Sequence, residues 1–339
     1  MRFVVLGSGA LGSYIGAALA RGGSDVILIA RGPQLEALQA DGVQVLSPRG
    51  DFTARIPATD DLGVIGDADV VIVTVKAYSL PALAPRLGAL LRDDAIVLPA
   101  QNGIPWWLFQ SFGGEYEGAV IESVDPKGIV TRSIGPQSVV GCVSYPATEL
   151  VAPGVVKHVE GTRFAIGELD STISDRCRAI SGAFVAGGLK CPIEQQIREQ
   201  LWLKLIGNVA FNPITTLTGA TLGELALASE VIELARGIME ECAAVGEALG
   251  ITMPVSVARR LDAGIAVGDH RTSMLQDFEA GKPLEIDCLS GAVTEIAALL
   301  GIDVSRTRAV DAALRLKTVL RDRDAALGVS RPIKKGVKQ

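Results

Sequence analysis

The start of the chain constrains the fold more than any other segment. It reads MRFVVLGSGALG, so an apolar run leads directly into Gly7, Gly9 and Gly12, and a small-residue segment follows. Glycine at these spacings allows a tight turn, close approach of the backbone to a pyrophosphate, and close packing of helix on strand. The free N–H groups at the start of such a helix favour an anion. We therefore predict a dinucleotide-binding βαβ unit, the alternative being a glycine-rich turn without a ligand. The predicted cofactor-binding residues here are Gly7, Ser8, Gly9, Ala10, Leu11 and Gly12.

The first half of the chain alternates short apolar runs with helical segments. Strands are predicted at residues 3–6, 26–30, 69–75, 95–99 and 119–121, with helices at 12–21 and 79–91. Strands that are apolar throughout are buried on both faces, as in a parallel sheet covered by helices. Further strands are predicted at 139–143, 155–158 and 164–166. The N-terminal domain is therefore predicted to be an α/β domain of the Rossmann type.

From about Ser174 the apolar periodicity becomes helical. Helices are predicted at residues 176–186, 195–217, 230–249, 255–266, 284–300 and 306–320, which indicates an all-α C-terminal domain. Glycines at 187 and 188 interrupt the pattern, and we place the boundary just after them. The predicted organisation is a Rossmann-type domain over residues 1–190, a helical domain over 191–325 and a flexible basic tail over 326–339.

The end of the second predicted strand bears on the choice of cofactor. Sites for NAD usually place an acid there to bind the ribose 2′-hydroxyl, whereas a cation suits a 2′-phosphate. This chain has Arg31 at that point and no acid between it and Glu36. We therefore predict NADP(H) as the cofactor, the alternative being that Arg31 is a solvated loop residue.

Two polar loops follow predicted strands of the same sheet. Lys76 comes directly after the run 70–75, and Asn102 lies in the sequence Gln101-Asn102-Gly103 after the run 96–99. Ligands of such folds bind at the carboxyl ends of the strands. Asn-Gly also makes a good turn without any ligand. Because both loops follow neighbouring strands, we predict Lys76 and Asn102 as cofactor-binding residues.

A long apolar segment in the helical half carries one polar stripe. It reads QQIREQLWLKLIGNVAFNPITTL, and its polar residues recur at steps of four, which places them along one helix face. Pro213 is predicted to end or kink this helix. The stripe could face solvent, but amides in place of the usual Glu/Lys mixture favour a polar cleft that holds a ligand. Its members are Gln196, Gln200, Lys204, Asn208 and Asn212.

Two shorter segments of the helical half also carry candidate residues. The sequence HRTSMLQD places Ser273 just ahead of an apolar pair, and Glu285 and Asp287 flank an isoleucine at the start of a predicted helix. Acids in a first helical turn are favoured by the helix dipole, so Asp287 needs no further role. For Glu285 the structural and the functional interpretation are equally supported.

Composition narrows the class of protein. The formal charge of −6 argues against a general nucleic-acid binder, and no apolar run reaches the roughly 18 residues of a membrane span. The Ala-rich start faintly resembles a secretory signal, but glycines interrupt it. Five scattered cysteines fit reduced thiols in a cytoplasm better than disulfides or zinc sites. With only His158 and His270, a His-based metal site or a Ser-His-Asp triad is nearly excluded. We predict a cytoplasmic protein without a metal.

Six motifs, in order along the chain, resemble those of the ketopantoate reductases (2-dehydropantoate 2-reductases). They are GSGALG, TVKA, QNG, LWLKLIGNVAFNP, TSMLQD and EID, and they extend from Gly7 through Glu285. The resemblance implies a cleft between the two domains that holds NADPH and a small 2-keto acid. It implies hydride transfer to 2-dehydropantoate, which yields pantoate.

The resemblance also implies roles for residues. Lys204 matches the proton donor of the family, and its charge would stabilise the negative charge that develops on the keto oxygen. Glu285 matches a residue at the cofactor or substrate end of the site, and we count it with the catalytic residues. Asn208, Asn212 and Ser273 match substrate-binding positions.

Two positions depart from the family pattern. Leu222 stands before Gly-Glu-Leu, and His270 stands three residues before Ser273, where some members have asparagine. Both positions belong to substrate recognition in the family, so a paralogue that reduces another branched 2-keto acid is an alternative. A non-catalytic NADP(H)-binding protein is a further alternative, although a sensor has no need of Lys204. The helical half would allow a homodimer.

Overall fold

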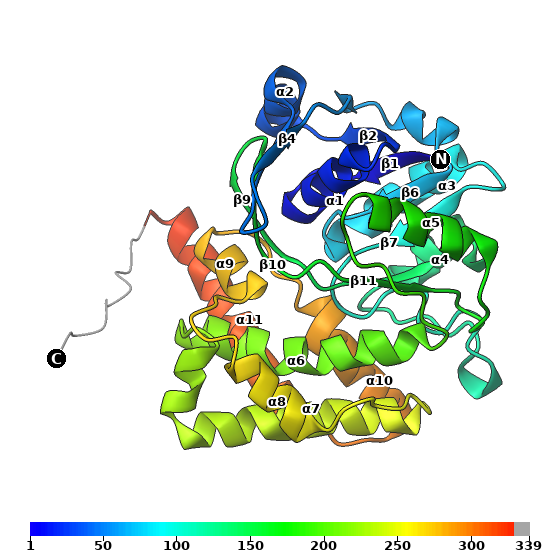
Figure 1. Cartoon of the computed structure of the whole chain (residues 1–339). Helices are drawn as coiled ribbons and strands as arrows, with labels where there is room; N and C mark the ends of the chain where they lie inside the picture. Colours follow the sequence, from blue (N-terminus) through cyan, green and yellow to red (C-terminus); the bar gives the residue numbers. More distant parts are fainter. Residues whose placement is uncertain (329–339) are drawn as a thin grey trace. The chain divides into compact units, whose positions relative to one another are not determined.

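The structure is a computed structural model that describes residues 1–328 (Figure 1). The chain divides into two compact units after Lys204, inside the long helix α6 (Ile197–Thr218). This division lies beyond the predicted boundary at residue 190, because the next segment is bonded to the first unit. Glu194 N–H donates to Ile166 O at 2.7 Å, and the Arg198 guanidinium donates to Leu108 O at 2.9 Å. Of the predicted tail, residues 329–339 lie outside the described residues.

The first unit contains the predicted parallel sheet. Its strand order is β5-β2-β1-β6-β7, and all pairs are parallel. The order reverses direction at β1, the point where α/β sheets bind their ligands. This confirms the Rossmann-type fold. The strands are β1 (Arg2–Leu6), β2 (Asp25–Ile29), β5 (Ala58–Thr59), β6 (Val70–Val73) and β7 (Ile96–Pro99).

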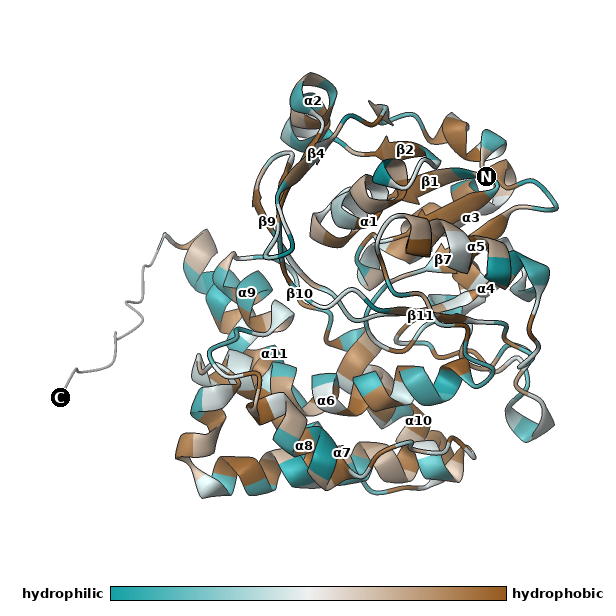
Figure 2. Cartoon of the chain, viewed as in Figure 1, coloured by the Kyte–Doolittle hydropathy of each residue, from teal (hydrophilic) through white to brown (hydrophobic). Residues whose placement is uncertain are grey.

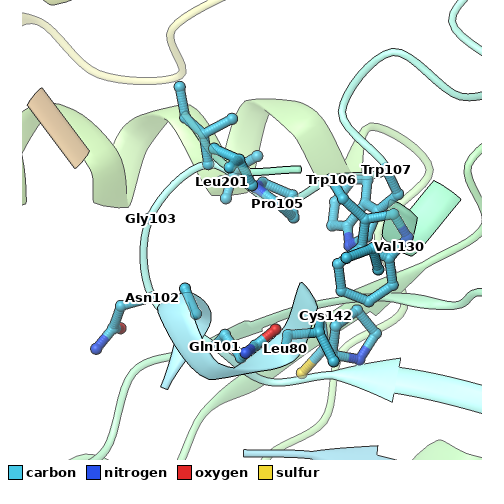
Figure 3. A pocket seen from close by; sticks show the side chains of 14 residues that line it. Leu80, Gln101, Asn102, Gly103, Pro105, Trp106, Trp107, Val130, Cys142 and Leu201 are labelled. Carbon is cyan, nitrogen blue, oxygen red and sulfur yellow. The ribbon is translucent and has the colours of Figure 1, made fainter. Parts of the chain in front are cut away.

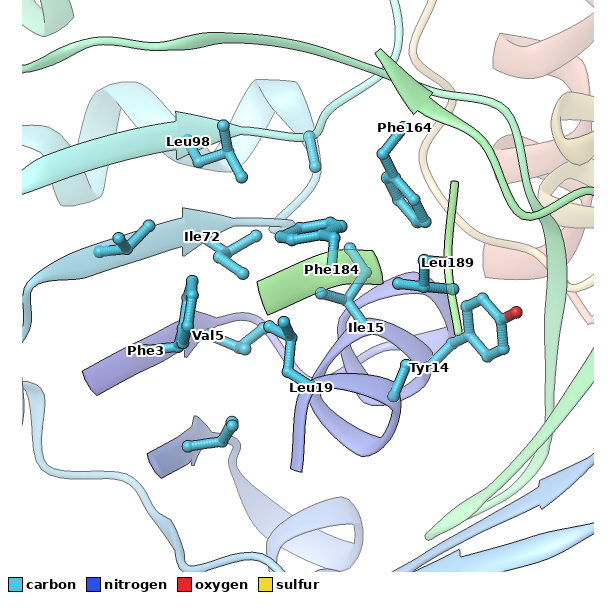
Figure 4. Close-up of a cluster of buried hydrophobic side chains, with 14 of the residues drawn as sticks. Phe3, Val5, Tyr14, Ile15, Leu19, Ile72, Leu98, Phe164, Phe184 and Leu189 are labelled. Carbon is cyan, nitrogen blue, oxygen red and sulfur yellow. The ribbon is translucent and has the colours of Figure 1, made fainter. Parts of the chain in front are cut away.

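Helix α1 (Ala10–Arg21) covers one face of this sheet. Alternate strand residues such as Phe3 and Val5 point to the same side, where they meet Ile15 and Leu19 of α1 in one buried cluster (Figure 4). Phe184 of helix α5 belongs to the same cluster. The strands themselves are mostly brown in Figure 2, as expected for strands buried on both faces. The remaining helices of this unit are α2 (Gly32–Asp41), α3 (Leu80–Leu90), α4 (Ile129–Ser133) and α5 (Asp175–Ala186).

Two smaller sheets complete the first unit. A four-stranded sheet of order β4-β3-β10-β9 packs against α1, and a two-stranded antiparallel ladder joins β11 to β8. The predicted strand at 119–121 is wrong. Those residues form a loop, in which the Val120 side chain is 40% exposed. A segment of three residues with one exposed side chain buries too little apolar surface to be stable as a strand. The strands are β3 (Val43–Leu46), β4 (Phe52–Ala54), β8 (Gly141–Ser144), β9 (Ala147–Ala152), β10 (Val155–Glu160) and β11 (Phe164–Gly167).

Within residues 205–328 the second unit consists of helices and the loops that join them, with no strand, which confirms the predicted fold class. Helix α7 packs against α8, α10 and α11. Its buried Glu241 accepts hydrogen bonds from the N–H groups of Arg306 (3.0 Å) and Thr307 (2.9 Å), and so caps α11. No helix within residues 1–328 is long and apolar enough to cross a bilayer. The helices are α7 (Ser229–Ala248), α8 (Val257–Ile265), α9 (Ser273–Glu279), α10 (Ala292–Leu300) and α11 (Ser305–Ala326).

Two helix ends bear on the predictions. Helix α6 continues through Pro213 to Thr218, close to the predicted range of 195–217, because proline removes only one backbone hydrogen bond; of the two predicted effects of Pro213, it therefore does not end the helix. The hydroxyls of Thr215 and Thr216 then bond back to the carbonyls of Phe211 (2.8 Å) and Asn212 (2.7 Å). The helix predicted from residue 284 begins only at a π-helical turn (Asp287–Gly291), so Glu285 lies ahead of the helix.

Candidate active site

The glycine loop between β1 and α1 has the geometry of a phosphate-binding turn. Gly7 has a φ of +106°, and a Cβ there would lie 2.8 Å from Val75 N. A Cβ on Gly12 would lie 2.1 Å from Gly7 O, so both positions exclude any side chain. A Cβ on Gly9, in contrast, would meet nothing within 4 Å. Gly9 therefore faces open space, where a pyrophosphate could approach the backbone.

The residues around Gly9 hold the loop in place. Gly9 is the N-cap of α1 and has no side chain to cap the helix, so the N–H groups of Ala10 and Leu11 are suited to an anion. The buried Ser8 hydroxyl donates to Ile29 O at 3.0 Å, and Ser8 O accepts from the Gln34 side-chain amide at 2.8 Å. Ser8 thus anchors the loop to the end of β2, and its side chain does not face the open space.

Arg31 is exposed and directly precedes α2, as its N-cap. A cation at a helix N-terminus is unfavourable for the helix dipole. Helix stability therefore does not explain Arg31, whereas an anionic ligand at this end of β2 would.

The loops after β6 and β7 carry Lys76 and Asn102, as predicted from the sequence. The Lys204 ammonium of α6 donates to Asn102 Oδ1 at 2.6 Å and also donates to Ser144 O at the end of β8. Lys204 is partly buried. The structure therefore brings a cation and an amide together at the carboxyl edge of the parallel sheet. An ammonium held there can donate a proton and stabilise a negative oxygen.

Cys142 of β8 lies close to this ammonium. Burial raises the pKa of the Cys142 thiol well above its usual range, and neighbouring Cys191 raises it further, which outweighs the opposite effect of Lys204. The thiol is therefore neutral at pH 7, and no thiolate competes for the Lys204 charge.

A small hollow lies beside the Asn102 loop (Figure 3). Its walls are largely apolar, and the side chain of Asn102 is directed away from it in Figure 3, whereas that of Gln101 lies along its edge. The residues that line it are Ala77, Leu80, Pro99, Gln101, Asn102, Gly103, Ile104, Pro105, Trp106, Trp107, Val124, Val130, Cys142 and Leu201.

The second unit carries the other predicted site residues. Asn208 and Asn212 lie four residues apart on α6, and Ser273 is the first residue of α9. The Thr272 hydroxyl caps α9 and shares a hydrogen bond of 2.7 Å with Thr215 of α6. This bond holds Ser273 near the turn of α6 that follows Asn212. Glu285 lies in the segment between α9 and the π-helical turn.

Part of the polar stripe on α6 has a structural role. Gln200 Oε1 accepts from Arg163 at 3.0 Å and from the Tyr145 hydroxyl at 3.3 Å, and Arg163 pairs with Glu194 at 2.7 Å. Gln196 is exposed. The predicted binding role therefore stays with Lys204 and the asparagines that follow it.

Some residues of the site were missed by the sequence reasoning. Gln101 donates to Val75 O at 2.6 Å, and the Thr74 hydroxyl donates to Gly7 O. Gln101 could have been found by its place beside Asn102. Ser144 holds Lys204 through a backbone carbonyl, which leaves no signal in the sequence.

The two positions that depart from the family pattern are neighbours in the second unit. Leu222 N–H donates to His270 O at 2.9 Å, and Leu222 is buried. Within residues 1–328, no group of three or more His, Cys, Asp or Glu side chains could hold a metal ion.

Comparison with known proteins agrees with the fold. The family model "Ketopantoate reductase PanE/ApbA" matches residues 3–171, and that of its C-terminal domain matches residues 196–318. A 2-dehydropantoate 2-reductase of Mesorhizobium japonicum is 41% identical over 317 residues, which cover 93% of this chain and 96% of that protein.

Solved structures agree as well. A putative ketopantoate reductase from Ralstonia solanacearum is 34% identical with a TM-score of 0.89, over 95% of this chain and 98% of that one. D-Mandelate dehydrogenase, solved with NADH and anilino(oxo)acetate, shares the fold at 20% identity and a TM-score of 0.80, over 95% of this chain and 100% of that one. With both of its units matched, the chain belongs to the ketopantoate reductase family of oxidoreductases.

Proposed function

We propose that this enzyme reduces 2-dehydropantoate to pantoate with NADPH, and that Lys204 is the proton donor. The observation that carries the proposal is the Lys204 ammonium, which donates to Asn102 Oδ1 at 2.6 Å and to Ser144 O at the carboxyl edge of the sheet. A 2-dehydropantoate 2-reductase is the named activity of the relative from Mesorhizobium japonicum.

The first unit fits a dinucleotide of this kind. Gly9 leaves open space for a pyrophosphate, and the start of α1 offers N–H groups to it. Arg31 supplies a cation for a 2′-phosphate at the end of β2, which supports NADPH over NADH. Lys76 and Asn102 follow the next two strands and would lie near the nicotinamide end.

The chemistry divides between the cofactor and the chain. NADPH supplies the hydride to the keto carbon when it is bound. Lys204 Nζ gives a proton to the keto oxygen, which becomes the hydroxyl, and the resulting amine takes up a proton from solvent. Asn102 and Ser144 O fix the direction of the ammonium before the substrate arrives, and this orientation lowers the entropic part of the barrier. Asn208, Asn212 and Ser273 are proposed to bind the substrate, and Glu285 to act beside them.

The test is NADPH oxidation with 2-dehydropantoate and with a panel of branched 2-keto acids. Lys204→Ala should lower kcat by about 10²- to 10⁴-fold, while NADPH still binds. Lys204→Arg keeps the charge but cannot release the proton, so it should also be slow. Lys190→Ala removes an exposed lysine of the same unit and serves as the control. Wild-type rates in Lys204→Ala would refute the mechanism, and no turnover of any panel member would refute the reductase function.

A second candidate is the reduction of another branched 2-keto acid. It is favoured by Leu222 and His270, which a backbone hydrogen bond of 2.9 Å brings together. At these two positions, where some members of the family have asparagine, this chain has an apolar side chain and an imidazole. A preference of about a hundredfold for another keto acid, roughly 2.7 kcal/mol, would select this candidate. The proton-donor role of Lys204 would stand in either case.

A further inference from the structure

The loop that carries Asn102 borders a small hollow on one side. Gln101, Asn102 and Gly103 are among the residues that line it. Gly103 has a φ of +85°, which gives the chain a turn that few other residues tolerate. On the side that faces the hollow the loop makes fewer dispersion contacts, so a polar contact can help to keep it in one position.

Gln101 provides such a contact. The backbone ladder between β6 and β7 ends where Ala100 N–H donates to Val73 O at 2.9 Å. Beyond it, Gln101 Nε2 donates to Val75 O at 2.6 Å, so a side chain extends the ladder into the loops. Val75 is fixed in turn, because its N–H donates to Leu6 O at 3.2 Å.

This contact joins the two loops that carry the polar side chains of the site. Lys76 directly follows Val75, and Asn102 directly follows Gln101. Asn102 Oδ1 then holds the Lys204 ammonium at 2.6 Å. Three hydrogen bonds, and the peptide link between Gln101 and Asn102, thus connect β1 to Lys204 along the carboxyl edge of the sheet.

We propose that Gln101 is a positioning residue of the reductase. Its hydrogen bond to Val75 O sets the place of Asn102 beside the hollow, and through Asn102 the direction of the Lys204 ammonium. Gln101 acts through Asn102 and does not itself touch the reacting atoms. This proposal rests on the proposed function of Lys204 as the proton donor.

The perturbation is Gln101→Glu, which keeps the shape of the side chain but replaces the donor by an oxygen that repels Val75 O. We expect kcat to fall about 10- to 100-fold, as for a small misplacement of a catalytic group. The Kd for NADPH should change by less than about threefold, below roughly 0.7 kcal/mol, because the proposed pyrophosphate and 2′-phosphate contacts at Gly9 and Arg31 are left in place and only the nicotinamide end is affected. Gln39→Glu is the matched control, because Gln39 Nε2 makes a similar bond of 3.0 Å to Ala58 O on the exposed surface.

A double-variant cycle separates positioning from a general loss of structure. If Gln101 acts through Asn102, Gln101→Glu should have little effect in an Asn102→Ala background, within about twofold. Effects that multiply in the double variant would overturn the proposal, as would an unchanged kcat in Gln101→Glu. Gln101→Leu, which lacks both the donor and the charge, should reproduce the loss, and normal kcat in Gln101→Leu would also overturn it.

Hydrogen exchange distinguishes failure of this proposal from failure of the proposed function. Amides of residues 102–108 should exchange faster in Gln101→Glu than in the wild type and in Gln39→Glu, whether or not any keto acid is reduced. Faster exchange together with an inactive wild type would leave the loop contact supported and refute the reductase function. Unchanged exchange would overturn the loop contact regardless of activity.

Discussion

Replacing Gly9 and Gly12 separately by alanine should separate cofactor binding from folding. The two glycines lie three residues apart in one loop, yet their surroundings are opposite. A Cβ at position 12 would be 2.1 Å from Gly7 O and 2.5 Å from the Thr74 hydroxyl, whereas a Cβ at position 9 would meet nothing within 4 Å. Gly9 also has φ −72° and ψ −161°, a conformation that alanine adopts without strain.

The distances set the expected magnitudes. Gly12→Ala requires the loop to move by roughly 1 Å, and overpacking of this kind costs about 1–3 kcal/mol of unfolding free energy. Gly9→Ala should change the unfolding free energy by less than about 1 kcal/mol, because a weaker N-cap and a stiffer unfolded chain offset each other. Its methyl group would occupy the space proposed for the pyrophosphate. Loss of one charge-assisted hydrogen bond is worth about 1.5–3 kcal/mol, so NADPH should bind roughly 10- to 150-fold more weakly.

The assay pairs urea unfolding with a titration of NADPH fluorescence on the same preparations. Gly9→Ala should unfold at nearly the wild-type midpoint but bind NADPH poorly, and Gly12→Ala should unfold at a lower urea concentration. Wild-type affinity in Gly9→Ala would refute the placement of the pyrophosphate over Gly9. Wild-type stability in Gly12→Ala would refute the packing argument for the loop.

Three further predictions follow from local contacts. Arg31→Ala should reduce the preference for NADPH over NADH by about 10-fold or more, as the ratio of the two kcat/KM values would show, and an unchanged ratio would mean that Arg31 does not contact the 2′-phosphate. Thr294→Val should raise the unfolding free energy by about 1 kcal/mol, because the buried Thr294 hydroxyl has no hydrogen-bond partner. Thr215→Val should lower it, because the Thr215 hydroxyl donates to Phe211 O at 2.8 Å. Equal effects of the two substitutions in urea unfolding would contradict this. Burial raises the pKa of Glu168, but hydrogen bonds from Arg176 and other donors outweigh it and leave the pKa below its ordinary value. Ionised Glu168 therefore stabilises the fold at pH values above its ordinary pKa of about 4.3, and this contribution is lost as the pH falls through the lower pKa of the folded state. In Glu168→Gln the unfolding free energy, measured by urea unfolding at several pH values, should fall less steeply as the pH is lowered.

Much of the α/β unit could be predicted because its signals are local. The apolar run of residues 3–6 predicts a buried strand, and the glycines after it predict a tight turn before a helix. β1 and α1 begin and end within two residues of the predicted bounds. The predicted helices of the second half are also present, and only the predicted start at residue 284 is wrong, because the helix begins at the π-helical turn from residue 287. The helix over 195–217 is present although Pro213 lies inside it, and the bond from the Thr216 hydroxyl to Asn212 O lies at this proline.

Strands that depend on distant partners could not be predicted in the same way. β3 is a short strand whose residues alternate between buried and exposed, and β9 is largely exposed. Both are strands because they pair with β10. The opposite error was made at 119–121, where an apolar triplet has no partner that would hold it as a strand. A strand gains its hydrogen bonds only from a neighbour, and the neighbour lies elsewhere in the chain.

By itself, the sequence determined the class of the fold, the glycine loop, the cationic end of the second strand and the choice of Lys204, Lys76 and Asn102 as candidates. Each of these depends on residue types at short spacings along the chain. In a regular strand or helix such spacings decide where each side chain lies. Only the tertiary structure showed that Lys204 contacts Asn102 across 102 positions of sequence, that Ser144 holds the same ammonium through a carbonyl, and that Gln101 joins two loops beside a hollow. These contacts depend on which strand ends meet at the edge of the sheet and on backbone atoms that every residue shares, and no residue pattern encodes them.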